Sequence, residues 1–180
     1  MADIINQKKT YQESQLKAIL LTGLTAGTLD ILAAIINTSI ALEKFAAVQV
    51  LRFIASGVFG KDAFTGGQVM VFFGLFFHYI IAFSFTTVYF LFYPRLPHIK
   101  YYKMVSGIIY GLIIWLIMNL IVVPLSQTPE LQFSWQRTLQ GIIILMVCVG
   151  IPISIIAGKY YEKKLFKHIN RLTKNGGYIN

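Results

Sequence analysis

Residues 18–42 read AILLTGLTAGTLDILAAIINTSIAL, a stretch that is apolar along most of its length and holds one ionisable side chain, Asp30. A transmembrane helix needs roughly 20 predominantly apolar residues to cross about 30 Å of hydrocarbon. This stretch is long enough, and we predict that it spans a membrane. Because an ionisable group inside hydrocarbon is costly, Asp30 is also a candidate functional residue.

Three more stretches have the same character, at residues 68–93, 104–125 and 138–158. The whole chain is 56% hydrophobic and 13% charged, whereas soluble domains contain about 25% charged residues. We therefore predict an all-α fold. Residues 18–158 form a bundle of four transmembrane helices, with residues 1–17 before it and a basic tail, residues 159–180, after it.

The distribution of positive charge predicts how the bundle is oriented. Of the 16 Lys and Arg residues, four fall in the connections that follow the first and third spans: Lys44, Arg52, Lys61 and Arg137. The others all fall in segments that share the opposite side of the membrane. Because Lys and Arg are enriched in cytoplasmic segments, we expect both termini in the cytoplasm.

The first outer connection, residues 43–67, contains apolar residues at helical spacing, among them Val48, Leu51 and Val58. This pattern predicts an amphipathic helix on the extra-cytoplasmic side, between the first and second spans. Two placements remain open for it. In the first placement, the helix rests on the lipid surface. In the second, it caps the mouth of the bundle and directs Arg52 inward.

Polar side chains at membrane depth suggest a common site. Asp30 lies near the middle of its span, and His78 and Asn119 lie in the outer halves of theirs. Asn37 is seven residues after Asp30 and therefore shares its helix face. We predict an outward-opening pocket with Asp30 at its floor and Arg52 at its mouth, in which Asp30 and His78 exchange a proton. The alternative is that the two side chains only fix the packing of the helices.

Small residues and prolines predict how the helices pack. Gly23-x3-Gly27 and Gly107-x3-Gly111 follow the close-packing pattern of membrane helices. Pro124 and Pro152 lie within the third and fourth spans, where each removes a backbone donor and is expected to kink its helix.

The tail after Gly158 combines an apolar stripe with basic side chains, including Lys163, Lys164, Lys167 and Arg171. Basic segments next to a span bind anionic lipid headgroups, so we expect anionic lipids as partners at the cytoplasmic face. Nucleic acid is not expected, because no recognition fold or aromatic platform accompanies the charge.

Enzyme and metal chemistry find little support in the residue pattern. The chain has no phosphate-cradling glycine loop and no H-E-x-x-H or G-x-S-x-G motif. One histidine is at membrane depth, and no Cys or carboxylate spacing completes a ligand set. Cys148 lies inside the fourth span, where a thiol behaves as a small apolar group. We expect neither an enzyme nor a cofactor or metal.

Several motifs resemble those of a family of uncharacterised small four-span bacterial inner-membrane proteins and, more distantly, the YagU-like proteins. These motifs are Arg52-x-x-Ala55-Ser56-Gly57-x-x-Gly60, Ala63-Phe64-x-Gly66-Gly67, Gly74-Leu75-x-x-His78-x-x-Ile81-Ala82-Phe83, and Tyr110-Gly111 with Met118-Asn119-Leu120-x-x-x-Pro124-Leu125-Ser126. The resemblance implies a bacterial inner-membrane location and supplies no substrate. Asp30 lies outside the best-matched segment.

Two functional hypotheses follow. The first is a small carrier or channel-like protein that moves a proton or small solute through a centre formed by Asp30, His78 and Asn119. Four short helices enclose little room for a pathway, which favours a homo-oligomer or a very small substrate. The second is a membrane scaffold or stress-related interaction protein that transports nothing, in which the polar centre only specifies packing.

Overall fold

The computed structural model describes residues 2–95, 101–129 and 133–174, and in these ranges it is helical, without strands. The first two long helices are α1 (Ala2–Leu42) and α4 (Gly67–Phe92), and η1 (Tyr93–Arg95) adds a short turn to α4. The other two run in three consecutive segments each: α6 (Lys103–Ile117), η2 (Met118–Val122) and α7 (Val123–Leu125), then α8 (Trp135–Ile144), η3 (Leu145–Gly150) and α9 (Ile151–Lys174).

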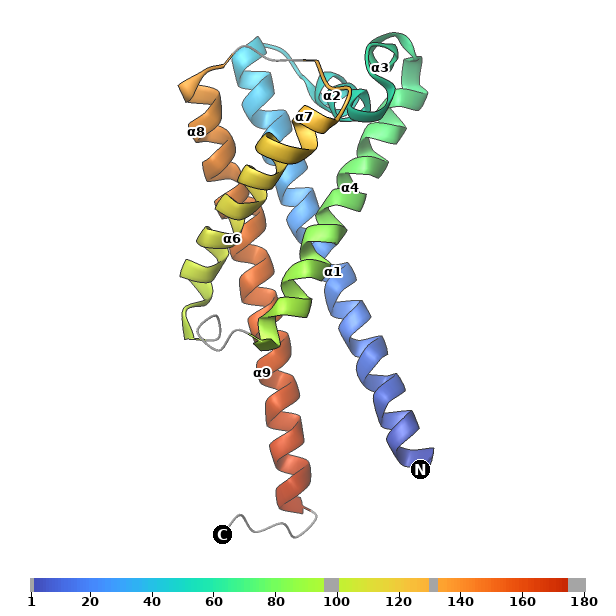
Figure 1. Ribbon diagram of the computed structural model, residues 1–180, viewed down its shortest axis with the longest axis vertical. Coiled ribbons are helices and arrows are strands. Elements are labelled where there is room, and N and C mark those ends of the chain that lie inside the picture. The colour runs from blue at the N-terminus through green and yellow to red at the C-terminus, as the bar shows by residue number, and fades with distance from the viewer. Residues whose placement is uncertain (1, 96–100, 130–132, 175–180) are drawn as a thin grey trace.

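Figure 1 shows these four long rods crossing one another, with α1 beginning and α9 ending at the same end of the molecule. We call this end the termini end and the opposite one the α2 end. In the described part of the chain, four helices are long and apolar enough to cross a membrane: Glu13–Leu42, Gly67–Arg95, Lys103–Leu125 and Trp135–Phe166. The predicted all-α bundle of four membrane-spanning helices is therefore confirmed.

Large apolar side chains on the outside of the bundle agree with this architecture. Leu21, Phe72 and Ile143, on three different spans, are each more than half exposed. An apolar surface this extensive is unusual for a soluble monomer. On a membrane-spanning bundle it faces lipid.

At the α2 end, α1 is joined to α4 by two short helices, α2 (Ala47–Phe59) and α3 (Asp62–Thr65). Leu51 and Ala55 of α2 are buried, whereas Val48 and Val58 are exposed. The apolar stripe expected along α2 is thus divided between the bundle and its surroundings. Gly74 of α4 lies so close to the backbone of Leu51 that no side chain fits between the two helices.

The far side of α2 contacts the segment that follows α7. The backbone N–H of Gln127 donates to the carbonyl of Gly57 over 3.0 Å. Because α2 bridges α4 and this segment, it caps one end of the bundle (Figure 1). Of the two placements left open by the sequence, these contacts favour the cap, but without the inward-directed Arg52, whose side chain bonds the carbonyls of Phe64 and Gly67.

Both prolines of the third and fourth spans follow a π-helical segment. The segment η2 ends two residues before Pro124, and η3 ends two residues before Pro152. A proline has no N–H to donate to the carbonyl four residues earlier, and its ring clashes with that carbonyl. The wider π-helical turn relieves the clash. Beyond Pro152 the helix continues as α9, whereas after Pro124 it ends at Leu125.

Three glycines bring α6 and η3 into backbone contact. A Cβ atom on Gly107 would lie 2.7 Å from the Cα of Ile151, and one on Gly111 would lie 2.5 Å from the Cα of Met146. Gly150 faces both glycines from the other helix. The glycine pair predicted at 107 and 111 therefore forms the closest helix contact of the third and fourth spans.

Replacing Gly111 with alanine is expected to lower the thermal unfolding temperature in detergent, because the new methyl group meets backbone that cannot move aside. Overpacking of this kind costs about 1–3 kcal/mol. Gly57→Ala is the matched control, since its Cβ would meet its nearest neighbour at an ordinary 3.5 Å. Equal unfolding temperatures for the two variants would contradict the assigned contact.

Candidate functional site

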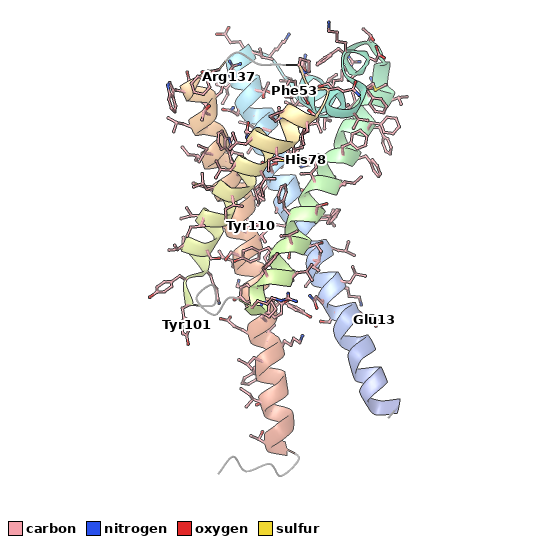
Figure 2. All side chains as sticks on the ribbon, in the orientation of Figure 1. Glu13, Phe53, His78, Tyr101, Tyr110 and Arg137 are labelled. Atoms are coloured by element: carbon pink, nitrogen blue, oxygen red, sulfur yellow. The ribbon has the colours of Figure 1, made fainter. Side chains whose placement is uncertain are left out.

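His78 is a buried, ionisable side chain of α4 that lies near the middle of the bundle (Figure 2). It is 8% exposed, and its Nε2 is 2.8 Å from the carbonyl oxygen of Gly27 on α1. A carbonyl can only accept, so Nε2 carries the proton and donates. In the neutral ring, Nδ1 is then left with a free lone pair.

Gly27 allows this approach. A Cβ on Gly27 would lie 3.1 Å from the Cβ of Ala82 and 3.1 Å from the ring of Tyr79. One position later, the Thr28 hydroxyl is 2.8 Å from the hydroxyl of Tyr79. Two successive hydrogen bonds thus tie α1 to α4, and the Tyr79 ring packs edge-on against His78 at 5.4 Å.

Asp30 lies one helical turn beyond Gly27, on the same face of α1. It is half-buried and close enough to His78 for their charges to interact. Cys148 of η3 is within the electrostatic range of Asp30 as well. Asp30 and His78 therefore lie on neighbouring helices near η3, and neither a hydrogen bond nor an ion pair joins their side chains in this structure. We call Asp30, His78 and the Gly27 carbonyl the Asp30–His78 centre.

The Asp30 carboxylate has an unusual environment within this centre. Among the residues that the structure describes, no hydrogen bond reaches it, and it forms no ion pair with His78. Buried or membrane-embedded carboxylates are normally paired or hydrogen-bonded, because desolvation of the charged form is costly. A half-buried carboxylate that is near a histidine and receives no hydrogen bond from the described residues is suited to accept and release a proton.

The two asparagines predicted for the pocket do not contact His78. Asn119 is exposed, and its Nδ2 donates to the carbonyl of Trp115 on its own helix over 2.9 Å. Asn37 is half-buried and lies two turns from Asp30, about 10 Å along the helix axis. The sequence placed both at the right depth, but the rotation of each helix decides what its side chains meet.

Arg52 does not reach the centre either. Its Nη1 donates to the carbonyl of Phe64 over 3.1 Å, and its Nη2 donates to the carbonyl of Gly67 over 3.2 Å. Both carbonyls belong to the turn from α3 into α4, where Gly67 has a left-handed φ of 71°. Arg52 therefore closes this turn, and the predicted placement at the mouth of the pocket is corrected.

A second polar cluster, which the sequence did not reveal, lies toward the termini end. Tyr89 of α4 is 2.7 Å from the hydroxyl of Ser106 on α6 and 2.8 Å from that of Ser154 on α9. Ser154 donates to the carbonyl of Lys103 over 2.5 Å. Serines and tyrosines are common in membrane helices, so only their meeting in space identifies the cluster.

Metal binding lacks a donor set in this arrangement. Across residues 2–95, 101–129 and 133–174, no group of three or more His, Cys, Asp or Glu side chains is placed to hold an ion. The chemistry of the centre is that of one carboxyl group, one imidazole and a nearby thiol.

Comparison of the chain with protein-family models, with curated proteins and with solved structures finds no match in any of the three. The resemblance to YagU-like membrane proteins therefore stays a prediction. The functional argument rests on the geometry of the Asp30–His78 centre.

Replacing Arg52 with methionine is expected to lower the unfolding temperature, because the carbonyls of Phe64 and Gly67 lose their donors. Hydrogen bonds to charged groups contribute about 1.5–3 kcal/mol each, and less where solvent reaches them. Lys61→Met, at an exposed position of the same corner, is the control. An unfolding temperature for Arg52→Met equal to that of the control would argue against the structural role.

Proposed function

We propose that this chain is a multi-pass protein of a bacterial inner membrane that moves a proton or very small solute through the Asp30–His78 centre. The observation that carries the proposal is the half-buried Asp30 carboxylate in the middle of a membrane-spanning helix, near the buried His78 and without a hydrogen bond from the described residues. A proton is the smallest possible cargo and suits four helices that pack with little space between them. Assembly into a homo-oligomer would give a larger solute more room.

The two side chains share a proton in a chemically simple way. His78 keeps its Nε2 proton on the Gly27 carbonyl, so exchange with Asp30 would use Nδ1. The two side chains form no ion pair in this structure, so the transfer requires them to approach each other or a water molecule between them. One extra proton shared by the pair leaves a neutral centre, either as carboxylate and imidazolium or as carboxylic acid and imidazole. Uptake and release of that proton from opposite sides of the membrane would constitute transport.

Basic residues support an orientation with cytoplasmic termini. Arg137 lies near the α2 end, and Tyr101, next to the basic start of α6, lies near the termini end (Figure 2). Most Lys and Arg residues of the described chain belong to the termini end, among them Lys17, Arg95, Lys103 and Lys163. The positive-inside rule assigns that end to the cytoplasm.

A scaffold without transport is the second candidate, and one observation favours it. The hydrogen bonds of His78 to Gly27 and of Tyr79 to Thr28 join α1 to α4 directly. Interhelical hydrogen bonds in membranes contribute on average about 0.6 kcal/mol each, so these contacts also serve helix packing. In a scaffold, Asp30 would contribute to packing or assembly only.

The double variant Asp30→Asn with His78→Phe distinguishes the two functions. Proton flux in proteoliposomes, driven by a potassium diffusion potential and followed with a trapped pH dye, is expected to fall at least tenfold. Asparagine and phenylalanine occupy similar space but cannot exchange the proton. Thr25→Val, at an exposed site on the same helix, serves as the control.

The outcome also separates a carrier from a scaffold. If the protein is a carrier, the double variant loses proton flux while its unfolding temperature stays within a few degrees of the parent's. A scaffold shows no flux above empty liposomes in the parent, and the double variant lowers the unfolding temperature or changes the oligomeric state. Equal stability and equal flux in parent and variant would exclude the centre from both functions.

We also propose that anionic lipids bind the start of the tail. The helix α9 continues without a break past Gly158, and Lys163 is exposed there, as are the large apolar side chains Leu165 and Phe166. A basic residue near an anionic surface contributes about 1 kcal/mol. Lys167 and Arg171 belong to α9, but their side chains are outside the described residues.

Replacing Lys163 and Lys164 with alanine is expected to reduce the thermal stabilisation that phosphatidylglycerol provides relative to phosphatidylcholine in mixed micelles. Added salt should weaken the parent's stabilisation in the same way, because it screens exposed charges. Lys61→Ala, at the α2 end, is the control. A phosphatidylglycerol effect of equal size in all three proteins would contradict this site.

A further inference from the structure

Burial is unevenly distributed along the bundle. The main buried cluster comprises Ala26, Tyr89, Phe90, Tyr93, Ile114, Val149, Ile153 and Ala157. Most of these residues lie between the Asp30–His78 centre and the termini end. In contrast, η2, α7 and α8, which lead from the middle of the bundle to the α2 end, contain no buried residue. At the α2 end, the cap instead provides the burial, since Leu51, Ala55 and Ser56 of α2 are buried. The termini side of the centre holds the main buried cluster.

A directed chain of hydroxyl groups holds this side together. Ser154 has one hydroxyl proton and donates it to the Lys103 carbonyl, which can only accept. Ser154 therefore accepts the proton of Tyr89, and Tyr89 in turn accepts that of Ser106. Each hydroxyl donates once, and together they join α4, α6 and α9. We call Tyr89, Ser106 and Ser154 the hydroxyl lock.

The hydroxyl lock excludes water from the helix junction. Ser154 is 0% exposed and Tyr89 is 4% exposed. The ring of Tyr110, which lies nearer the termini end than His78 (Figure 2), packs against that of Tyr89 at 4.7 Å. Along α4, eleven residues separate His78 from Tyr89, which corresponds to about 16 Å.

A second layer lies just beyond the lock. The rings of Tyr93 and Tyr161 stack with their centroids 4.9 Å apart and their planes 9° apart. The Tyr161 hydroxyl donates to the carbonyl of Phe90 over 2.7 Å. At the surface, Lys103 forms an ion pair with Glu162 over 2.5 Å. These contacts close the bundle between the centre and the termini end.

From these contacts we infer that the hydroxyl lock is a gate, which separates the Asp30–His78 centre from water at the termini end. The inference rests on the proposed function, because a gate has a role only where the centre exchanges a proton or solute. In this structure the gate is closed. Opening requires α9 to move away from α4 and α6, so that water enters and reaches the centre.

The chemistry of the lock suits a reversible contact. Hydroxyl groups that part from one another find replacement partners in water, so opening leaves no polar group unsatisfied. Interhelical hydrogen bonds in membranes are individually weak. A lock of three hydroxyls can therefore hold two conformations within a few kcal/mol of each other, as alternating access requires.

Cys148 provides a test without an introduced reporter, because it is the chain's single cysteine and belongs to η3, which packs against α1. A charged, membrane-impermeant methanethiosulfonate is added to membrane vesicles on the side of the termini, and the rate of Cys148 modification is measured. The parent is expected to react slowly. Tyr89→Phe combined with Ser154→Ala, which removes two hydroxyls and keeps the ring, is expected to react about ten times faster.

Ser84→Ala is the matched control, since the Ser84 hydroxyl is exposed and bonds only within α4. Ser106→Ala removes one hydrogen bond of the lock and is expected to give a smaller increase in the rate of Cys148 modification. This variant is used instead of the double variant if the double variant does not fold. The gate is overturned if the folded lock variants react no faster than the parent. It is also overturned if the parent already reacts as fast as a thiol in water.

Access and transport are measured separately in this design. If the parent transports protons but the lock variants modify Cys148 no faster than the parent, the gate is overturned and the proposed function stands. Faster modification without flux in the parent would overturn the proposed function, while showing that the lock controls water entry.

Discussion

The hydrogen bond from the His78 ring to the Gly27 carbonyl forms because no side chain stands between α1 and α4 at this point. Backbone carbonyls of a helix are normally shielded by the side chains around them. At Gly27 the carbonyl is open to an imidazole from the neighbouring helix, and the close approach brings Thr28 to Tyr79 and places Asp30 beside His78. The polar centre thus depends on the absence of one methyl group.

The same constraint recurs across the bundle. The backbone of α2 packs directly against Gly74, and the backbone of η3 packs directly against Gly107 and Gly111. Lipid offers apolar side chains no less favourable surroundings than another helix does, so membrane helices associate through close packing and hydrogen bonds. Glycine supplies the close packing here. The hydroxyl lock and the centre supply the hydrogen bonds, and each lies where glycine or serine has brought the backbones together.

Parts of the site could be predicted from the sequence and parts could not. Asp30 and His78 stood out because each is an ionisable residue in a long apolar run, and the structure places them on neighbouring helices without a direct hydrogen bond. Asn119 stood out by its depth in the third span and Arg52 by its place on the outer amphipathic helix. In the structure, Asn119 bonds to its own helix and Arg52 closes the turn between α3 and α4. Depth follows from position along the chain, whereas contact also requires the rotation of each helix and the path of the connections.

The sequence by itself determined the number of spans, the helical fold and the glycine positions at which helices meet, because hydrophobic length and small-residue spacing are local properties. Only the tertiary structure decided that α2 caps the bundle, that Arg52 serves a turn, and that Tyr89 meets serines from two other helices. Tyr89 and Ser154 are 65 positions apart. Nothing near either residue specifies the other, and their contact arises only when α4 and α9 pack side by side.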